Sequence, residues 1–175
     1  MPGLQVHAFS AKWNEIHFGK DEYGKPYLAN ENHLIKYNIS HSGTKVAGVI
    51  SKELVGIDVE QIKETHMDIA KRWFAEEEIE YIVKEESEEG QARRFYEIWT
   101  KKESYSKAVG KGLSLSFKSF NTLGELAIDT VPYYIYTVDL EDGYAFSVCS
   151  VCPAEYIVYN EFTLEQLYNE VTQMM

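Results

Sequence analysis

The spacing of hydrophobic residues changes twice along this chain, which restricts the folds open to it. Runs at 36–40, 46–50 and 55–60 are of strand type and are separated by His-Ser-Gly and Ser-Lys-Glu breaks, which predicts antiparallel strands joined by short connections. From 66 to 110, apolar residues recur at steps of three and four, which predicts helices. Tyr- and Val-rich runs follow at 113–117, 133–140, 144–151 and 156–159, and they predict a second sheet.

The order of these elements predicts an α+β fold with two small antiparallel sheets packed on helices. The longer helix is expected over 91–109, with Gly110 and Gly112 ending it. Thr163 and Gln166 have the spacing of a capping box, which predicts a short terminal helix. The acidic run from Glu76 to Glu89 is most simply a solvated helix face and loop without chemistry.

Composition excludes several classes of function. The 175 residues fit one domain or a tight pair of subdomains. A net charge of -11, from 17 Lys+Arg against 28 Asp+Glu, argues against a nucleic-acid or anionic-membrane partner, because such surfaces need excess positive charge. No apolar run approaches the roughly 20 residues that span a bilayer, and no signal peptide is recognisable. We therefore expect a cytoplasmic protein.

Cys149 and Cys152 form a C-x-x-C spacing, which occurs in zinc sites and in redox motifs. A structural zinc needs further ligands, and a redox motif of the thioredoxin type needs a helix after it. These cysteines lie instead in a strand-like run that ends at Pro153. We expect inert thiols that behave as small hydrophobic residues.

Two pairs of charged residues have spacings that suit a catalytic site. Asp58 and Glu60 alternate with aliphatic residues in a predicted strand, so both carboxylates leave one face. Glu103 and Lys107 are four apart on a predicted helix and share a face. Each pair has an ordinary explanation, since a half-exposed strand alternates in this way and a surface salt bridge has this helical spacing.

A third candidate is the end of the predicted strand at 36–40, where Ser40, His41 and Ser42 follow one another. Backbone amides and an imidazole at such a position can bind an anion. A lone histidine is, however, more often a structural hydrogen-bonding residue than a ligand.

The order of the motifs along the chain favours a functional site over these ordinary explanations. YGKPY, YNISHSG, VGIDVE, FAEEE and WTKKESYSKAVGKGLSL follow one another in the chain. Together they resemble the 4′-phosphopantetheinyl transferase superfamily, in particular the larger, pseudo-dimeric type that activates surfactin synthetase. The similarity runs from about Tyr23 to Glu165.

The resemblance implies roles for individual residues. Asp58, Glu60 and Glu103 would hold Mg²⁺, and Lys107 would contact phosphates. Mg²⁺ prefers oxygen ligands completed by substrate phosphates and water, so two or three carboxylates are sufficient. Contacts with coenzyme A would come from two short stretches, namely Tyr23, Gly24 and Lys25, and Ile39, Ser40 and His41.

The implied reaction is that of a holo-[acyl-carrier-protein] synthase type enzyme. A serine of an acyl or peptidyl carrier protein attacks the β-phosphate of coenzyme A, and adenosine 3′,5′-bisphosphate leaves. Lys107 and His41 would stabilise the leaving side, and Glu103, or a water beside it, is the candidate base. Carrier docking is expected on the segment after Gly110, at Lys111, Leu113, Leu115 and Phe117.

The resemblance also implies two lobes. Residues 1–60 would form a shortened first lobe with coenzyme A and metal residues, and residues 61–175 a second lobe with metal and carrier-protein residues. Members of the superfamily have a further N-terminal helix and cations that hold the 3′-phosphate. A chain without them could be a catalytically impaired relative that only binds coenzyme A or a carrier protein, and its uncovered sheet favours a homodimer. A phosphohydrolase using the same carboxylates is a third reading.

Overall fold

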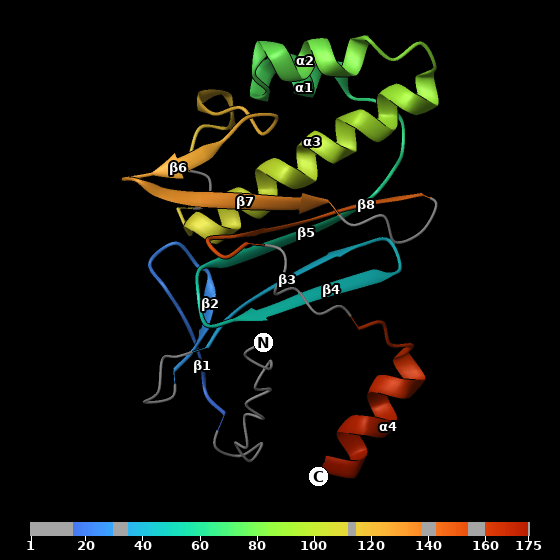
Figure 1. Cartoon of the computed structure of the whole chain (residues 1–175). Helices are drawn as coiled ribbons and strands as arrows, with labels where there is room; N and C mark the ends of the chain where they lie inside the picture. The colour runs from blue at the N-terminus through green and yellow to red at the C-terminus, as the bar shows by residue number, and fades with distance from the viewer. Residues whose placement is uncertain (1–15, 30–34, 112–114, 138–142, 154–159, 175) are drawn as a thin grey trace, which may run out of the picture.

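The computed structural model of the chain describes residues 16–29, 35–111, 115–137, 143–153 and 160–174. Its elements, shown in Figure 1, are β1 (Phe18–Lys20), β2 (Pro26–Leu28), β3 (Lys36–Ser42), β4 (Lys45–Ser51), β5 (Val55–Gln61), α1 (Met67–Trp73), α2 (Glu76–Val83), α3 (Glu88–Val109), a 3₁₀ turn at Phe117–Ser119, β6 (Leu126–Ile128), β7 (Val131–Thr137), β8 (Tyr144–Ser150) and α4 (Leu164–Met174). This order confirms the α+β class. Expected strand residues at 113–114, 138–140 and 156–159 lie outside the described part.

The described strands are all paired antiparallel, but they form three hydrogen-bonded groups where the sequence predicted two sheets. β5, β8, β7 and β6 make a four-stranded sheet in that order, while β1–β2 and β3–β4 are separate hairpins. The predicted first and second lobes share the larger sheet, because β5 pairs with β8 along its whole length. The division into lobes at residue 60 stays a prediction.

Helix α3 crosses one face of the four-stranded sheet, and the β3–β4 hairpin packs beside β5 (Figure 1). Ser87 caps the helix by accepting a hydrogen bond from the amide of Gly90 at 3.0 Å, so α3 begins at Glu88, earlier than predicted. Its predicted C-terminal stop is confirmed, since Gly110 adopts a left-handed φ of 77°. The capping box of Thr163 and Gln166 is formed at the start of α4.

The helix and the sheet approach very closely at Gly56 of β5. A side chain there would place its Cβ 2.1 Å from the carbonyl oxygen of Ser104 and 2.4 Å from the backbone nitrogen of Ala108. No other residue fits without moving α3. Gly56 therefore sets the distance between β5 and the helix that carries Glu103 and Lys107.

One prediction about the acidic run is wrong. Glu78 on α2 is fully buried, and its carboxylate pairs with the ammonium of Lys102 at 2.8 Å. The same carboxylate accepts hydrogen bonds from the amides of Ala75 and Thr122. Glu78 lies on the face of α2 that packs against α3, whereas Glu76, Glu77 and Glu80 are exposed to solvent.

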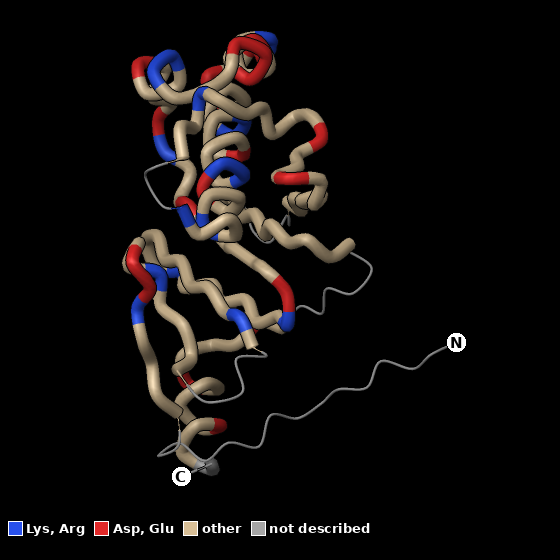
Figure 2. Tube along the Cα trace, turned by 90° about the vertical axis from the view of Figure 1, so that its left-hand side faces the viewer, with Lys and Arg blue, Asp and Glu red and all other residues tan. Residues whose placement is uncertain are grey.

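The buried thiol, the charged residues and the helices bear on the remaining expectations from the sequence. Cys149 is buried, and burial raises its pKa to about 12, so its thiol stays protonated. Figure 2 shows acidic and basic residues interspersed over the helices in the upper part of the view. Among the described residues, no helix has the length and apolar character needed to cross a membrane.

Candidate active site

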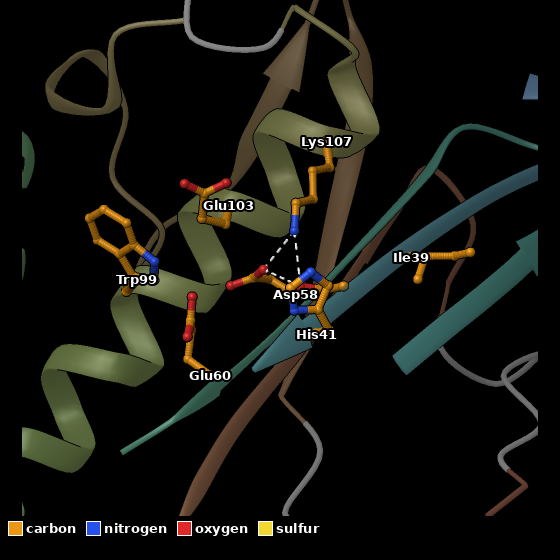
Figure 3. Close-up of a pocket in the computed structure, with 8 residues that line it drawn as sticks. Ile39, His41, Asp58, Glu60, Trp99, Glu103 and Lys107 are labelled. Carbon is orange, nitrogen blue, oxygen red and sulfur yellow. Dashed lines mark hydrogen bonds and ion pairs between the residues drawn. The ribbon is translucent and has the colours of Figure 1, made fainter. Parts of the chain in front are cut away.

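A pocket of about 350 Å³ opens where β3, β5 and α3 meet (Figure 3). Its lining combines carboxylates, a lysine, an imidazole and one indole. The lining residues are Ile39, Ser40, His41, Asp58, Glu60, Trp99, Glu103 and Lys107. The two charged pairs and the Ile-Ser-His stretch singled out in the sequence thus meet at one place.

The local folds explain this convergence. In β5, Ile57 and Val59 enter an apolar cluster, and the alternation of the strand turns Asp58 and Glu60 to the other face. Glu103 and Lys107 lie one helical turn apart on α3, which packs on β5. Asp58 is only 3% exposed, so the interpretation as a half-exposed strand does not describe it.

Only one of the two carboxylate oxygens of Asp58 has hydrogen-bond partners in the described structure. Its Oδ1 accepts hydrogen bonds from Lys107 Nζ at 2.6 Å and from Ser40 Oγ at 2.8 Å. Its Oδ2 is buried and finds no hydrogen-bond partner in the described part of the chain. Burial raises the pKa of Asp58, and the charge of Lys107 opposes that rise. One buried carboxylate oxygen therefore remains able to accept a cation or a donor.

Glu103 and Glu60 both lie to the left of Asp58 in the view of Figure 3, Glu103 above it and Glu60 below it. Burial raises the pKa of Glu103, and the negative charge of Asp58 raises it further. Glu60 accepts a hydrogen bond from Ser42 Oγ at 2.7 Å. The carboxylates therefore repel one another, and a bound cation would relieve that repulsion.

The carboxylates of the pocket are of the chemical type that binds Mg²⁺, but their side chains are not arranged around a common point. Carboxylate oxygens are the ligands this ion prefers, and the unpartnered Oδ2 of Asp58 is one of them. Within the described ranges, however, no group of three or more His, Cys, Asp or Glu side chains is arranged to hold a metal ion. Lys107 occupies the other oxygen of Asp58. The metal assignment of Asp58, Glu60 and Glu103 therefore stays a prediction.

The predicted coenzyme A residues divide between two pockets. Ile39, Ser40 and His41 line the first, whereas Tyr23 and Lys25 line a second pocket of about 300 Å³ beside the C-terminal end of α3. Gly24 forms the turn between the latter two, with a φ of 82°. The ammonium of Lys25 donates to the carbonyl oxygen of Lys107, and burial lowers its pKa. Their contacts with coenzyme A stay predictions.

Comparison with known proteins decides the family. A sequence model described as "4′-phosphopantetheinyl transferase superfamily" matches residues 54–155, more than half of the chain. The chain belongs to this superfamily. A second model, described as "4′-phosphopantetheinyl transferase, N-terminal", matches residues 3–53. The resemblance inferred from the motifs is thereby confirmed.

Several curated transferases are similar to the chain. It is 36% identical over 150 residues to 4′-phosphopantetheinyl transferase Sfp of Bacillus subtilis, covering 80% of this chain and 65% of that protein. It is 40% identical over 145 residues to the transferase gsp of Aneurinibacillus migulanus, covering 78% of this chain and 59% of that protein. The chain therefore spans less than two thirds of the length of these relatives.

Two further residues belong to the surroundings of this pocket, and the sequence assigned no such role to either. Trp99 lines the pocket one turn before Glu103, and Ser42 holds Glu60. The signal for Trp99 was its place in W-x-x-K-E, whereas Ser42 was named only as part of a candidate anion site, and its spacing of two from Ser40 was the signal for its contact with Glu60.

The predicted carrier surface is partly wrong. Phe117 is buried, with its ring centroid 6.0 Å from those of both Trp99 and Phe120, so it belongs to the core. Leu115 is half-buried and Lys111 is exposed. Leu113 lies outside the described residues. The aromatic density of this segment reflects packing against α3, which a sequence pattern does not distinguish from an exposed apolar patch.

Proposed function

We propose that the chain transfers the 4′-phosphopantetheine group of coenzyme A to a serine of an acyl or peptidyl carrier protein, with Mg²⁺, and releases adenosine 3′,5′-bisphosphate. Membership of the superfamily supports this reaction. The observation that carries it is one pocket lined by Asp58, Glu60, Glu103 and Lys107. A cluster of carboxylates next to a lysine suits a phosphate substrate accompanied by a divalent cation.

Asp58, Glu60 and Glu103 would hold the cation. When bound, Mg²⁺ would neutralise charge that develops on the phosphate oxygens during transfer. The free Oδ2 of Asp58 supports this role, because a buried carboxylate oxygen without a partner is costly unless a ligand completes it. Binding requires Lys107 to share Asp58 or to release it.

Lys107 is suited to that exchange. Its ammonium donates to Asp58, to Ser40 Oγ and to the carbonyl oxygen of Ile57, yet its side chain is 28% exposed to the pocket. A phosphate oxygen arriving there would compete for the same donors with a charge-assisted hydrogen bond. His41, which is exposed in the pocket lining, would contribute a second donor.

The transfer step breaks one bond and forms one. The carrier serine Oγ bonds to the β-phosphorus of coenzyme A, and the bond from that phosphorus to the bridging oxygen breaks, so adenosine 3′,5′-bisphosphate leaves. Glu103 takes the serine proton. Its raised pKa suits this role, because a base is most effective when its pKa lies closer to the working pH.

The direct test is mass spectrometry of an apo-carrier protein incubated with the chain, coenzyme A and Mg²⁺. We expect the carrier to gain one phosphopantetheine on its serine and adenosine 3′,5′-bisphosphate to appear in equal amount. Parallel reactions with an acyl and a peptidyl carrier establish the preferred class. Absence of modification with both carriers, at high enzyme concentration, would refute the proposal for this chain.

A second candidate function is binding without transfer. It is favoured by the contacts of two lysines that are predicted to bind coenzyme A, since Lys25 and Lys107 both donate to groups of the protein itself. Calorimetric binding of coenzyme A without any carrier modification would identify this case. Hydrolysis of coenzyme A without a carrier would instead indicate a phosphohydrolase.

We also propose that the chain forms a homodimer through the outer face of the β3–β4 hairpin. Val46 and Ile50 on that face are each 76% exposed. Large apolar side chains exposed on one face of a strand can be covered by a second copy of the chain. Light scattering at tens of micromolar tests the proposal, which a strictly monomeric protein would contradict.

A further inference from the structure

Strands β3 and β5 lie in contact, yet their main chains are not joined by a ladder in the described part of the structure. Side chains at alternate positions of β3 make the connection instead. Asn38 Oδ1 accepts the amide of Ile57 at 2.9 Å, and Ser40 Oγ donates to Asp58 at 2.8 Å. Ser42 Oγ donates to Glu60 Oε2 at 2.7 Å. Two of the three links end on carboxylates of the pocket.

The alternation of β3 explains why these side chains act together. Positions two apart in a strand share a face, so Asn38, Ser40 and Ser42 all turn toward β5. Ile39 and His41, between them, are exposed. The spacing along both strands is matched, because Ser40 and Ser42 are two apart, as are Asp58 and Glu60.

The direction of each hydroxyl is fixed by a second bond. The amide of Gln61 donates to Ser42 Oγ at 3.0 Å, so the single hydroxyl proton of Ser42 is left for Glu60. Lys107 Nζ donates to Ser40 Oγ at 3.2 Å, and the proton of Ser40 is likewise left for Asp58. Both serines therefore act as donors, Ser42 to Glu60 and Ser40 to Asp58.

We propose that Ser42 is a positioning residue that fixes the carboxylate of Glu60 for cation binding, as Ser40 does for Asp58. The β3–β4 hairpin thus sets the orientation of both carboxylates through two hydroxyl groups. A residue that hydrogen-bonds to a metal-binding side chain restricts the orientation of that side chain. Loss of such a residue commonly weakens metal affinity about 10- to 100-fold. This inference rests on the proposed function, since it assumes that Glu60 binds a cation.

Ser42 is the better member of the pair to test. Ser40 is also a predicted coenzyme A contact and bonds to Lys107, so its replacement would alter several interactions at once. Ser42 is not among the residues that line the pocket, and its hydroxyl bonds to Glu60 and to the backbone amide of Gln61, so its link to the pocket is through Glu60. Ser51 on β4 provides a matched control, because within the described residues its hydroxyl makes only a local bond, accepted from the amide of Glu53 at 3.0 Å.

The experiment is a titration of the chain with Mn²⁺ in the presence of coenzyme A, followed by the electron paramagnetic resonance signal of free Mn²⁺. We expect Ser42→Ala to weaken Mn²⁺ binding about tenfold. Ser42→Thr, which keeps the hydroxyl, should stay within about threefold of the wild type by the same reasoning, and Ser51→Ala should not differ from it. Coenzyme A affinity measured without metal should be unchanged in all three variants.

A double-mutant cycle shows whether the effect passes through Glu60. In a Glu60→Gln background, Ser42→Ala should cause no further loss of Mn²⁺ affinity, because the carboxylate that it orients is gone. Thermal unfolding of each variant without metal separates positioning from folding. A Tm loss in Ser42→Ala with unchanged Mn²⁺ affinity would make Ser42 purely structural and overturn the inference.

The outcomes distinguish this inference from the proposed function. If the wild type binds Mn²⁺ and modifies a carrier while Ser42→Ala binds Mn²⁺ equally well, only the positioning role fails. If the wild type binds no Mn²⁺ with coenzyme A present, the positioning role fails together with the cation site. Carrier modification by the wild type, measured separately, then decides whether the transferase proposal survives.

Discussion

Two of the three lysines of helix α3, Lys102 and Lys107, each pair with a carboxylate from another element, in very different surroundings. Lys102 and Glu78 lie 2.8 Å apart, and both side chains are 0% exposed. Lys107 and Asp58 lie 2.6 Å apart, with side chains 28% and 4% exposed. Both pairs contain a buried carboxylate, so burial alone does not separate their roles.

The difference lies in how completely each pair is satisfied. Lys102 also donates to the carbonyl oxygens of Phe117 and Phe120, and Glu78 accepts from Ala75 and Thr122. Asp58 keeps one oxygen without a partner in the described structure. A completed network fixes one conformation, whereas an incomplete one can accept a ligand. We therefore assign stability to the first pair and chemistry to the second.

The largest expected effect is a loss of stability in Lys102→Met. This change leaves Glu78 as a buried charge without its cation and removes donors from two carbonyl groups, which should cost about 3–5 kcal/mol. Urea unfolding measures the free energy. Burial lowers the pKa of Lys102, which shows the cost of its charge there.

A double-mutant cycle checks the origin of that loss. Glu78→Gln combined with Lys102→Met should cost less than the sum of the single variants, because no uncompensated charge remains. A loss below about 1 kcal/mol in Lys102→Met would mean that the pair adds little, as exposed pairs do.

Lys107→Ala should reduce activity strongly and stability only slightly. We expect the rate of carrier modification to fall about 100- to 1,000-fold, as when a donor to transition-state charge is removed. Stability should fall by only about 1–2 kcal/mol, because Asp58, whose pKa burial already raises, can take up a proton. Parallel rate and unfolding measurements test both parts. Equal stability losses in Lys107→Ala and Lys102→Met would remove the distinction between the pairs.

The pH dependence of stability tests the environment of Glu103, which lies in the same pocket as Lys107 and Asp58. Burial, and then the charge of Asp58, raise its pKa in the folded state. Its contribution to stability is therefore present below the unfolded pKa, near 4.3, and is lost as pH rises through the folded value. Glu103→Gln should have a higher Tm than the wild type at pH 8 without metal, with a difference that shrinks toward about pH 4.

Thermal scans across this range measure the difference. Addition of Mg²⁺ and coenzyme A should raise the Tm of the wild type more than that of Glu103→Gln, because only the wild type retains the carboxylate. A variant less stable than the wild type at pH 8 without ligands would contradict the raised pKa.

Local patterns predicted much of the fold. Strands at 36–42, 45–51 and 55–61 follow from alternation and turn residues, and the end of α3 follows from Gly110. The arrangement of the strands did not follow, because β3 meets β5 through Asn38 and Ser40 rather than through its main chain. The spacing of two between such side chains shows that they share a face, but it does not show which strand they contact.

The site was predicted in its residues but not in its contacts. Family motifs named Asp58, Glu60, Glu103 and Lys107, and the structure brings them to one pocket. Neither the ion pair of Lys107 with Asp58 nor the separate pocket of Lys25 could be read from the motifs. Both depend on distances between elements, which are set by close packing such as that at Gly56.

The smallest expected effect comes from Glu80, which lies two residues after Glu78 in the same acidic run. Positions two apart on a helix point to different sides, and the pair of Glu80 with Lys84 is 67% and 71% exposed at a separation of 3.8 Å. Glu80→Gln should therefore change the free energy of unfolding by less than about 0.5 kcal/mol, whereas Glu78→Gln should cost several times more. Urea unfolding at low and high salt measures both, and only the small effect of Glu80→Gln should depend on salt. Similar losses in the two variants would show that burial on α2 does not separate a structural glutamate from a solvated one.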